Sequence, residues 1–235
     1  MVKLIKLEWK KNHIGKHIRN ALILAAILCL FVYAMDFLGI ANDAETGVPD
    51  AAPGMNMIAS TIELFSSMVF LVFTGVMLSS FIVNAYKNKT MNLMFSYPIK
   101  RQKILASQML AVWIFNFLAL VITKLLMYTT ILTGSRFMNS AFSLGFDMGN
   151  LHFYIQLILK SAVIVSMGFI ALFIGIAMKS PTATIITSFL LVFLTQANIG
   201  DFTMSDSAAF PVILTVISII FAFLSVYKAE IRDVL

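Results

Sequence analysis

Six long apolar stretches run through this sequence, and each approaches the length that a helix needs to cross a membrane. They are residues 21–40, 62–83, 104–132, 153–178, 183–199 and 208–227. About 20 apolar residues in a helix span a hydrocarbon core about 30 Å thick. Because the runs are continuous rather than alternating, they exclude the strands of a membrane β-barrel. We expect an all-α, polytopic membrane protein with six transmembrane helices in one domain, residues 1–235.

The composition supports a membrane protein and excludes a soluble one. Hydrophobic residues make up 60% of the chain and charged residues 12%, with a mean hydropathy of +0.93. Soluble domains have about 45–50% apolar and about 25% charged residues. The same values exclude disordered, collagen-like and coiled-coil chains. The single cysteine, Cys29, cannot form an internal disulfide and leaves the redox compartment open.

Two of the stretches allow a second interpretation. The first could be a cleaved signal peptide, but its basic leader is long and no small-residue cleavage site follows it. We therefore expect it to be retained as a helix. The fifth is short, and the polar residues 196–207 after it form either a loop or a re-entrant segment shielded by protein.

The distribution of charge predicts the orientation. The N-terminus, the loop after the second stretch, the connection 178–183 and the C-terminus hold 14 of the 17 Lys and Arg and three acids, a local charge of +11. The other side holds three cations and eight acids, a charge of −5. Short loops rich in Lys and Arg stay cytoplasmic. We expect both termini in the cytoplasm, and we interpret the basic excess as topology and lipid contact rather than nucleic-acid binding.

The first 19 residues form a basic, amphipathic segment. Lys3, Lys6 and Lys10 recur at helical spacing, with Trp9 beside them. Such a segment can lie along the membrane interface, with lysines at the headgroups and the indole near the acyl boundary. The alternative is a generic basic flank of the first transmembrane helix.

The loop after the second stretch contains a short apolar helix. Thr90 is a suitable N-cap, and residues 91–97 make about two turns before Pro98. This helix carries Met91, Leu93, Met94, Phe95 and Tyr97, which are too apolar for a helix that only lies in the cytosol. It either dips into the membrane or docks on another protein.

The whole chain resembles a type-2 ABC transporter permease, the transmembrane subunit of a bacterial ABC exporter. The loop 86–101 supplies the family pattern in order, with Lys87, Thr90, Leu93, Pro98, Ile99 and Arg101. The short connection 178–183 also fits. Many relatives carry a glutamate before the basic run, whereas this chain has Asn84, Ala85 and Tyr86 there. The chain looks closer to the small permeases of bacterial peptide-antibiotic immunity and export systems.

The resemblance implies a function and a set of partners. It implies a coupling helix that contacts a separate ATPase subunit through Thr90, Met91, Leu93, Met94, Phe95 and Tyr97. ATP and Mg²⁺ would bind that partner, and a second permease copy or a related permease would complete the transporter. The implied location is the bacterial plasma membrane. The implied substrate is amphipathic or hydrophobic, such as an antimicrobial peptide.

Motifs for chemistry within the chain itself are absent from the sequence. No phosphate-binding G-x-x-x-x-G-K-[S/T] loop, His-Glu-x-x-His or Cys-x-x-Cys occurs. His13 and His17 share a helical spacing but lie in a lysine-rich segment, which favours headgroup contact over metal binding. We expect no catalytic or metal site and no enzyme activity. A non-transporting scaffold or sensor, or an intramembrane enzyme, is the alternative.

Charged residues inside the apolar stretches are the other candidate site. Lys124 and Lys160 each cost about 2.5–3.5 kcal/mol at a bilayer centre. The simpler interpretation is that both snorkel to the outer headgroups. The alternative is that they face a cavity and pair with Asp36 or Glu63, which lie at a similar depth.

Small residues mark one face of the fourth stretch. Gly168, Ala171 and Gly175 recur at helical spacing. Such a face is usually a site of close helix packing. A dimer seam is the rarer alternative.

Overall fold

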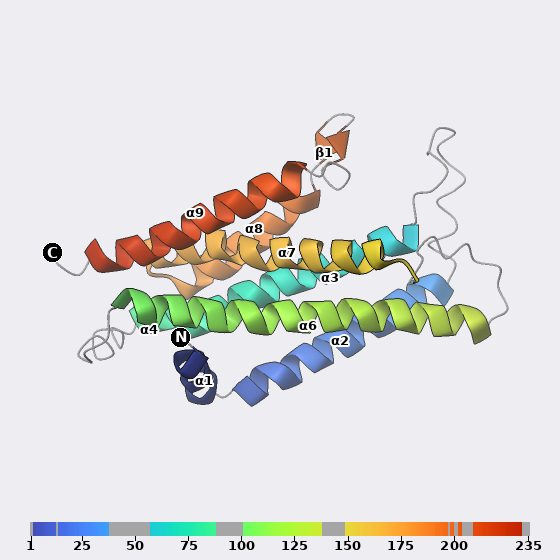
Figure 1. Ribbon diagram of the computed structural model, residues 1–235, viewed down its shortest axis with the longest axis horizontal. Helices are drawn as coiled ribbons and strands as arrows, with labels where there is room; N and C mark the ends of the chain where they lie inside the picture. The colour runs from blue at the N-terminus through green and yellow to red at the C-terminus, as the bar shows by residue number, and fades with distance from the viewer. Residues whose placement is uncertain are drawn as a thin grey trace.

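The protein is a bundle of long helices (Figure 1). The computed structural model describes residues 2–12, 14–37, 57–87, 101–137, 149–196, 198–199, 202–203 and 209–231. The elements are α1 (Val2–Lys11), α2 (Ile14–Phe37), α3 (Met57–Leu78), the π-helical segment η2 (Ser79–Val83), α4 (Asn84–Lys87), α6 (Arg101–Phe137), α7 (Leu151–Met178), α8 (Pro181–Gln196), β1 (Asn198–Ile199), β2 (Phe202–Thr203) and α9 (Ala209–Ile231). Each of the six predicted apolar stretches falls largely within one helix.

Four helical stretches in the described residues are long and apolar enough to cross a membrane. They are Ile14–Met35, Ala59–Lys87, Gln102–Gly134 and Leu151–Met178. Pro181–Phe193 in α8 and Ile213–Tyr227 in α9 are shorter apolar stretches. Large apolar side chains also cover the outside of the bundle, among them Leu30 on α2 and Phe223 on α9. By length and composition, the described helices are those of a helical membrane protein.

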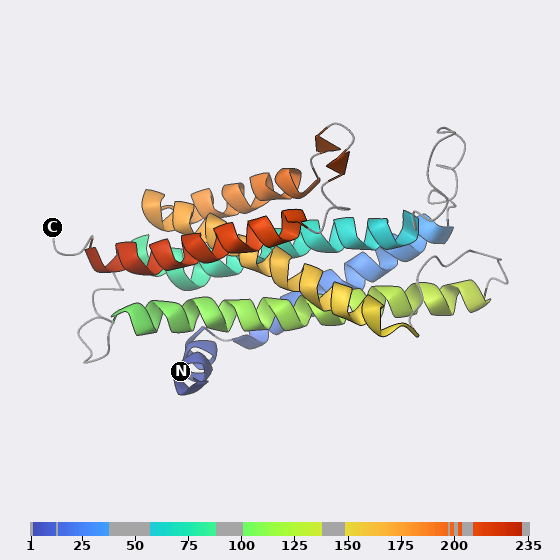
Figure 2. The same ribbon diagram turned by 45° about the horizontal axis from the view of Figure 1, so that its top comes forward.

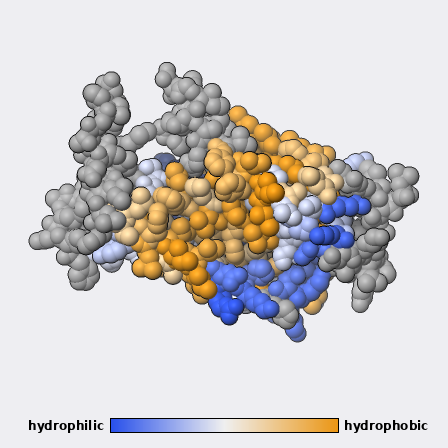
Figure 3. Space-filling view, turned by 180° about the vertical axis from the view of Figure 1, so that it is seen from behind, coloured by the Kyte–Doolittle hydropathy of each residue, from blue (hydrophilic) through white to orange (hydrophobic). Residues whose placement is uncertain are grey.

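The helices alternate in direction. α2, α6 and α8 run one way and α3, α7 and α9 the other (Figures 1 and 2). One end of the bundle, on the left in Figure 1, carries α1, α4 and the C-terminal end of α9. We call it the basic end, because it carries the exposed side chains of Lys3, Lys6, Lys10, Lys11, Lys16, Arg19, Lys87, Lys103 and Lys179. The opposite end is the distal end. Figure 3 shows the hydrophilic patch beside an apolar belt.

The helix α3 forms the centre of the bundle. It packs against α2, α6, α7 and α8. Phe70, Leu71, Met77 and Leu78 are at most 1% exposed. A helix that is apolar all round needs neighbours or lipid on every side. The apolar composition of residues 62–83 is therefore compatible with the central position of α3.

The small residues predicted on the fourth stretch lie where α7 meets other helices of the same chain. A Cβ on Gly168 would lie 2.7 Å from Thr74 Cγ2 of α3, and a Cβ on Gly175 would overlap the hydroxyl of Thr184 on α8. Ala171 between them has no exposed surface. The absence of side chains at both glycines lets α7 approach two neighbours closely, as small residues do in membrane bundles.

A π-helical turn interrupts the rod formed by α3 and α4. The backbone N–H of Asn84 bonds to the carbonyl of Ser79, five residues earlier. The Ser79 hydroxyl donates to the carbonyl of Pro181, 3.0 Å away at the start of α8. Single π-turns inside helices often occur at functional sites. No feature of the sequence pattern predicts this one.

A tight turn joins α7 to α8 at the basic end. Lys179 has φ 50°, in the left-handed region, and the Ser180 N–H donates to the Gly175 carbonyl at 3.2 Å. Pro181 then begins α8, a position that suits its fixed φ. The short turn makes α7 and α8 antiparallel neighbours.

Two boundaries differ from those expected from the sequence. The break expected near residue 20 lies between Lys11 and Ile14, so residues 14–19 belong to the long helix α2. At the break, the side-chain amide of Asn12 donates to the Glu8 carbonyl at 3.1 Å, at the end of α1. After α8, β1 and β2 pair as an antiparallel hairpin, with Ile199 opposite Phe202. The fifth stretch, expected to continue to residue 199, therefore ends as a helix at Gln196. The polar tail 196–207, expected as a loop or a re-entrant segment, contains a short hairpin.

Candidate functional site

The predicted ATPase contact, with Thr90, Met91, Leu93, Met94, Phe95 and Tyr97, lies outside the described residues. Its flanks are described. α4 ends at Lys87 and α6 begins at Arg101, both at the basic end (Figure 1). Residues 88–100 therefore connect α4, which continues the rod of α3, to the long helix α6.

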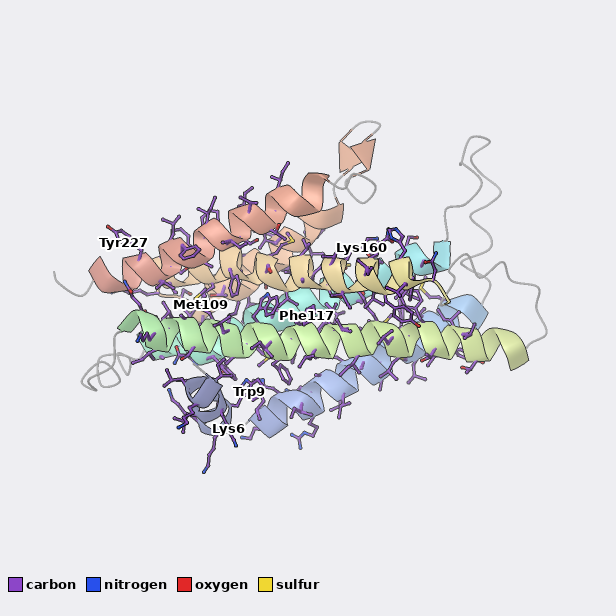
Figure 4. All side chains as sticks on the ribbon, viewed as in Figure 1. Lys6, Trp9, Met109, Phe117, Lys160 and Tyr227 are labelled. Atoms are coloured by element: carbon purple, nitrogen blue, oxygen red, sulfur yellow. The ribbon has the colours of Figure 1, made fainter. Side chains whose placement is uncertain are left out.

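The helix α1 docks on α6 close to this point. Trp9 Nε1–H donates to the Ala111 carbonyl at 3.1 Å, and Gln108 Nε2–H donates to Glu8 Oε1 at 3.3 Å. Lys6 lies on the side of α1 away from α6 (Figure 4). The same short helix thus packs on the bundle with one face and exposes lysines on another. The indole of Trp9, expected near the acyl boundary, instead donates to the backbone of α6.

Glu8 is a functional candidate that the sequence pattern indicates only as one charge of the N-terminal segment. It is 8% exposed, and its carboxylate accepts from Asn12 at 3.3 Å in addition to Gln108. Lys11 lies 3.9 Å away. A lone acid among the six cations of the first 19 residues was the signal that could have singled it out.

A fully buried stripe runs along α6 from Glu8 toward the distal end. Its members are four residues apart and have no exposed surface: Gln108, Val112, Asn116, Leu120 and Lys124. A helix rises about 1.5 Å per residue, so the stripe extends about 24 Å, most of the thickness of a hydrocarbon core. Its first polar residue meets Glu8, and its last meets Glu63.

At the distal end of this stripe, two lysines share one carboxylate. Lys124 Nζ of α6 lies 3.0 Å from Glu63 Oε1 of α3, and Lys160 Nζ of α7 lies 3.2 Å from Glu63 Oε2. The three side chains come from three helices and join them. We call Glu63, Lys124 and Lys160 the charge cluster. Lys160 is labelled in Figure 4 in the distal half of α7.

The two lysines are exposed to different degrees. The side chain of Lys124 has no exposed surface, that of Glu63 is 26% exposed and that of Lys160 is 43% exposed. Snorkelling is therefore wrong for Lys124, because its ammonium is enclosed by protein. Lys160 pairs with Glu63, but part of its side chain remains exposed at the surface of the bundle. Asp36, the other acid considered as a partner, belongs to α2, but its side chain lies outside the described residues.

Aromatic and polar neighbours surround the cluster. Tyr128 follows Lys124 by one turn and packs edge-on against Phe153, with ring centroids 4.9 Å apart. The Ser67 hydroxyl donates to the Glu63 backbone carbonyl. Within the residues described, no group of three or more His, Cys, Asp or Glu could hold a metal ion. The cluster can hold charge and attract an anion.

Comparison with known proteins yields one full-length similarity. No family model matches the chain, and no solved structure matches it. The "Uncharacterized protein YcbO" of Bacillus subtilis (strain 168) is 28% identical over 236 residues. The aligned region covers 98% of this chain and 99% of that protein. The similarity thus extends over the whole membrane bundle, and the name of the relative states no activity.

Proposed function

We propose that this chain is the membrane subunit of an ATP-driven exporter of the type-2 ABC class. The observation that carries the proposal is the arrangement at the basic end. Residues 88–100, which hold most of the family-like motif, connect α4 to α6, and α1 docks on α6 through the Trp9–Ala111 hydrogen bond. A partner that pushes on this loop would act directly on the first turns of α6.

The proposed topology has six transmembrane helices and cytoplasmic termini. The shorter helices α8 and α9 would be the fifth and sixth spans, in addition to the four long candidate spans. The alternating directions of the helices support this arrangement (Figure 1). The basic end would face the cytoplasm, since Lys and Arg mark cytoplasmic loops. The membrane would be the bacterial plasma membrane.

The proposed assembly has further parts. The ATPase subunit would be a separate chain that binds ATP and Mg²⁺, and a second permease copy or a related permease would complete the transporter. The substrate would be amphipathic or hydrophobic, such as an antimicrobial peptide. The apolar outer surface of the bundle suits a substrate that enters from the membrane.

The test is capture of the ATPase. The tagged chain is purified in mild detergent from its own host, and mass spectrometry searches for a copurifying chain with a G-x-x-x-x-G-K-[S/T] motif. The variant Leu93→Asp/Phe95→Asp should lose that chain, because charge opposes docking of an apolar helix. Asn88→Asp/Asn92→Asp adds the same charge to the same loop and should retain it.

Two outcomes contradict the proposal. Retention of the ATPase by both double variants would show that residues 90–97 are not its contact. Purification of the wild-type chain without any such ATPase would favour a scaffold or sensor.

A further inference from the structure

By formal charge, the charge cluster has an excess of one positive charge. Glu63 contributes one negative charge and the two lysines contribute two positive charges. Of the acidic side chains that the structure describes, Glu8 lies at the basic end, and only Glu63 lies in this half of the bundle. An uncompensated charge beside apolar surroundings is costly, and membrane proteins usually pair it. The cluster is therefore suited to one further anion.

Lys160 is the member of the cluster that can reach such an anion. Its side chain is 43% exposed, whereas Lys124 is enclosed. On α7, Lys160 lies at the border between the exposed apolar surface and the buried face of the helix. The exposed side chains of Ile155 and Leu159 flank one side, and the buried side chains of Leu157 and Ile164 flank the other. The ammonium is thus accessible from the surface that faces lipid.

A polar strip leads from Lys160 toward the distal end of α7. His152, Gln156 and Lys160 follow each other at intervals of four residues, so they share one face of the helix. The Gln156 amide and the His152 ring are 2.9 Å apart, and both side chains are exposed. Polar groups in line on an otherwise apolar, lipid-facing helix surface require a polar partner or water.

We infer that Lys160, assisted by Gln156 and His152, binds the phosphate of an anionic lipid headgroup. A phosphodiester supplies one negative charge and two oxygens that accept hydrogen bonds, and an ammonium has three donors. One of these donors is directed to Glu63, and the exposed side of Lys160 leaves room for another contact. The acyl chains would lie on the exposed surfaces of Ile155 and Leu159. This apolar surround favours a lipid over an acidic peptide.

The test measures the apparent dissociation constant for phosphatidylglycerol by native mass spectrometry of the full chain in neutral detergent. Lys160→Gln should weaken binding about tenfold, the loss expected for one charge-assisted hydrogen bond. Lys160→Arg should retain binding. Lys179→Gln makes the same charge change on an exposed side chain at the other end of α7 and should have a smaller effect. Equal losses for Lys160→Gln and Lys179→Gln, or no loss for Lys160→Gln, would overturn the proposal.

A second variant should act in the opposite direction. Glu63→Gln removes the carboxylate that pairs with Lys160. It should therefore tighten phosphatidylglycerol binding several-fold. Glu8→Gln adds the same net charge at the basic end and should not tighten it, and equal tightening by both would contradict the site. Glu63→Gln leaves Lys124 without its carboxylate and could prevent folding. In that case the Lys160 variants, which keep the Lys124–Glu63 pair, decide the test.

The lipid and the free anion are separated by competition. Inorganic phosphate in tenfold excess should leave phosphatidylglycerol bound, and phosphatidylcholine, whose headgroup has no net charge, should bind more weakly. Displacement of phosphatidylglycerol by inorganic phosphate would show that the site binds the free anion, and it would overturn the proposal of a lipid site. If the Asp36→Asn variant binds phosphatidylglycerol specifically and the wild type does not, Asp36 already supplies the second negative charge to the cluster. That result would overturn the proposal.

Discussion

The indole N–H of Trp9 lies 3.1 Å from the carbonyl oxygen of Ala111, 102 residues further along the chain. This bond places α1 against α6 one residue from the Glu8–Gln108 contact. The N-terminal segment is therefore part of the packed protein at the end where the motif loop begins and ends.

Loss of the Trp9 bond should loosen α1 without unfolding the bundle. Trp9→Phe keeps most of the apolar surface and removes the donor, at a cost of about 1 kcal/mol. Trypsin should then cut after Lys10 and Lys11 several times faster than in the wild type, measured by intact-mass analysis. Trp113→Phe removes a similar bond, to the Ser166 hydroxyl at 3.1 Å, inside the bundle. Faster cutting of α1 in Trp113→Phe to the same degree would contradict a specific tether.

In the charge cluster, Glu63 should matter more than either lysine. Glu63→Gln leaves two ammonium groups without their shared carboxylate, and Lys124 has no access to water. Breaking a buried ion pair from one side costs about 3–5 kcal/mol, and the 26% exposure of Glu63 places this case toward the lower value. Thermal unfolding in detergent should show a large drop in Tm for Glu63→Gln. Adding Lys124→Met should recover much of it.

Removal of Lys160 should have a small effect on stability. Were Lys160 the single partner of Glu63, Lys160→Leu would leave an uncompensated carboxylate. The structure gives Glu63 a second, fully enclosed partner in Lys124, so the remaining pair is neutral. We expect Lys160→Gln to lower stability by less than about 1 kcal/mol, as for half-exposed pairs. A drop in Tm as large as that of Glu63→Gln would show that the two lysines act as one unit.

The sequence predicts the helices and the depth of the charges, but not which side chains meet. Apolar runs locate α2, α3, α6 and α7, since each run must cross the same apolar layer. They do not specify rotation about the helix axis, because lipid and protein interiors are equally apolar. For this reason the sequence favours snorkelling for Lys124, whereas the structure places it on the buried stripe, four residues from Leu120 and eight from Asn116. The docking of α1 on α6 depends on tertiary contacts across 102 residues and leaves no local signal.

Close packing at Gly175 predicts a strong steric effect. A Cβ there would overlap the Thr184 hydroxyl and lie 3.2 Å from Val83 Cγ2. Gly175→Ala should destabilise the bundle by about 1–3 kcal/mol, the usual cost of overpacking. Thr184→Ala in the same chain removes the overlapping oxygen and should recover part of the loss in Tm. Gly15→Ala, where nothing lies within 4 Å, should be neutral or slightly stabilising, and equal losses at both glycines would contradict the steric explanation.

Single cysteines test the proposed orientation in intact cells. In a Cys29→Ser background, which removes the single native thiol, an impermeant maleimide labels only cysteines that face outward. Ala44→Cys follows α2 and Asn139→Cys follows α6, and both helices end at the distal end, so both cysteines should react. Asn88→Cys follows α4 at the basic end and should react only after the cells are opened. The exposed lysines gather at that end, and moving them across a membrane is unfavourable, which is the physical reason for the expected asymmetry. Labelling of Asn88→Cys in intact cells would place the basic end outside, and it would exclude contact between residues 90–97 and a cytoplasmic ATPase.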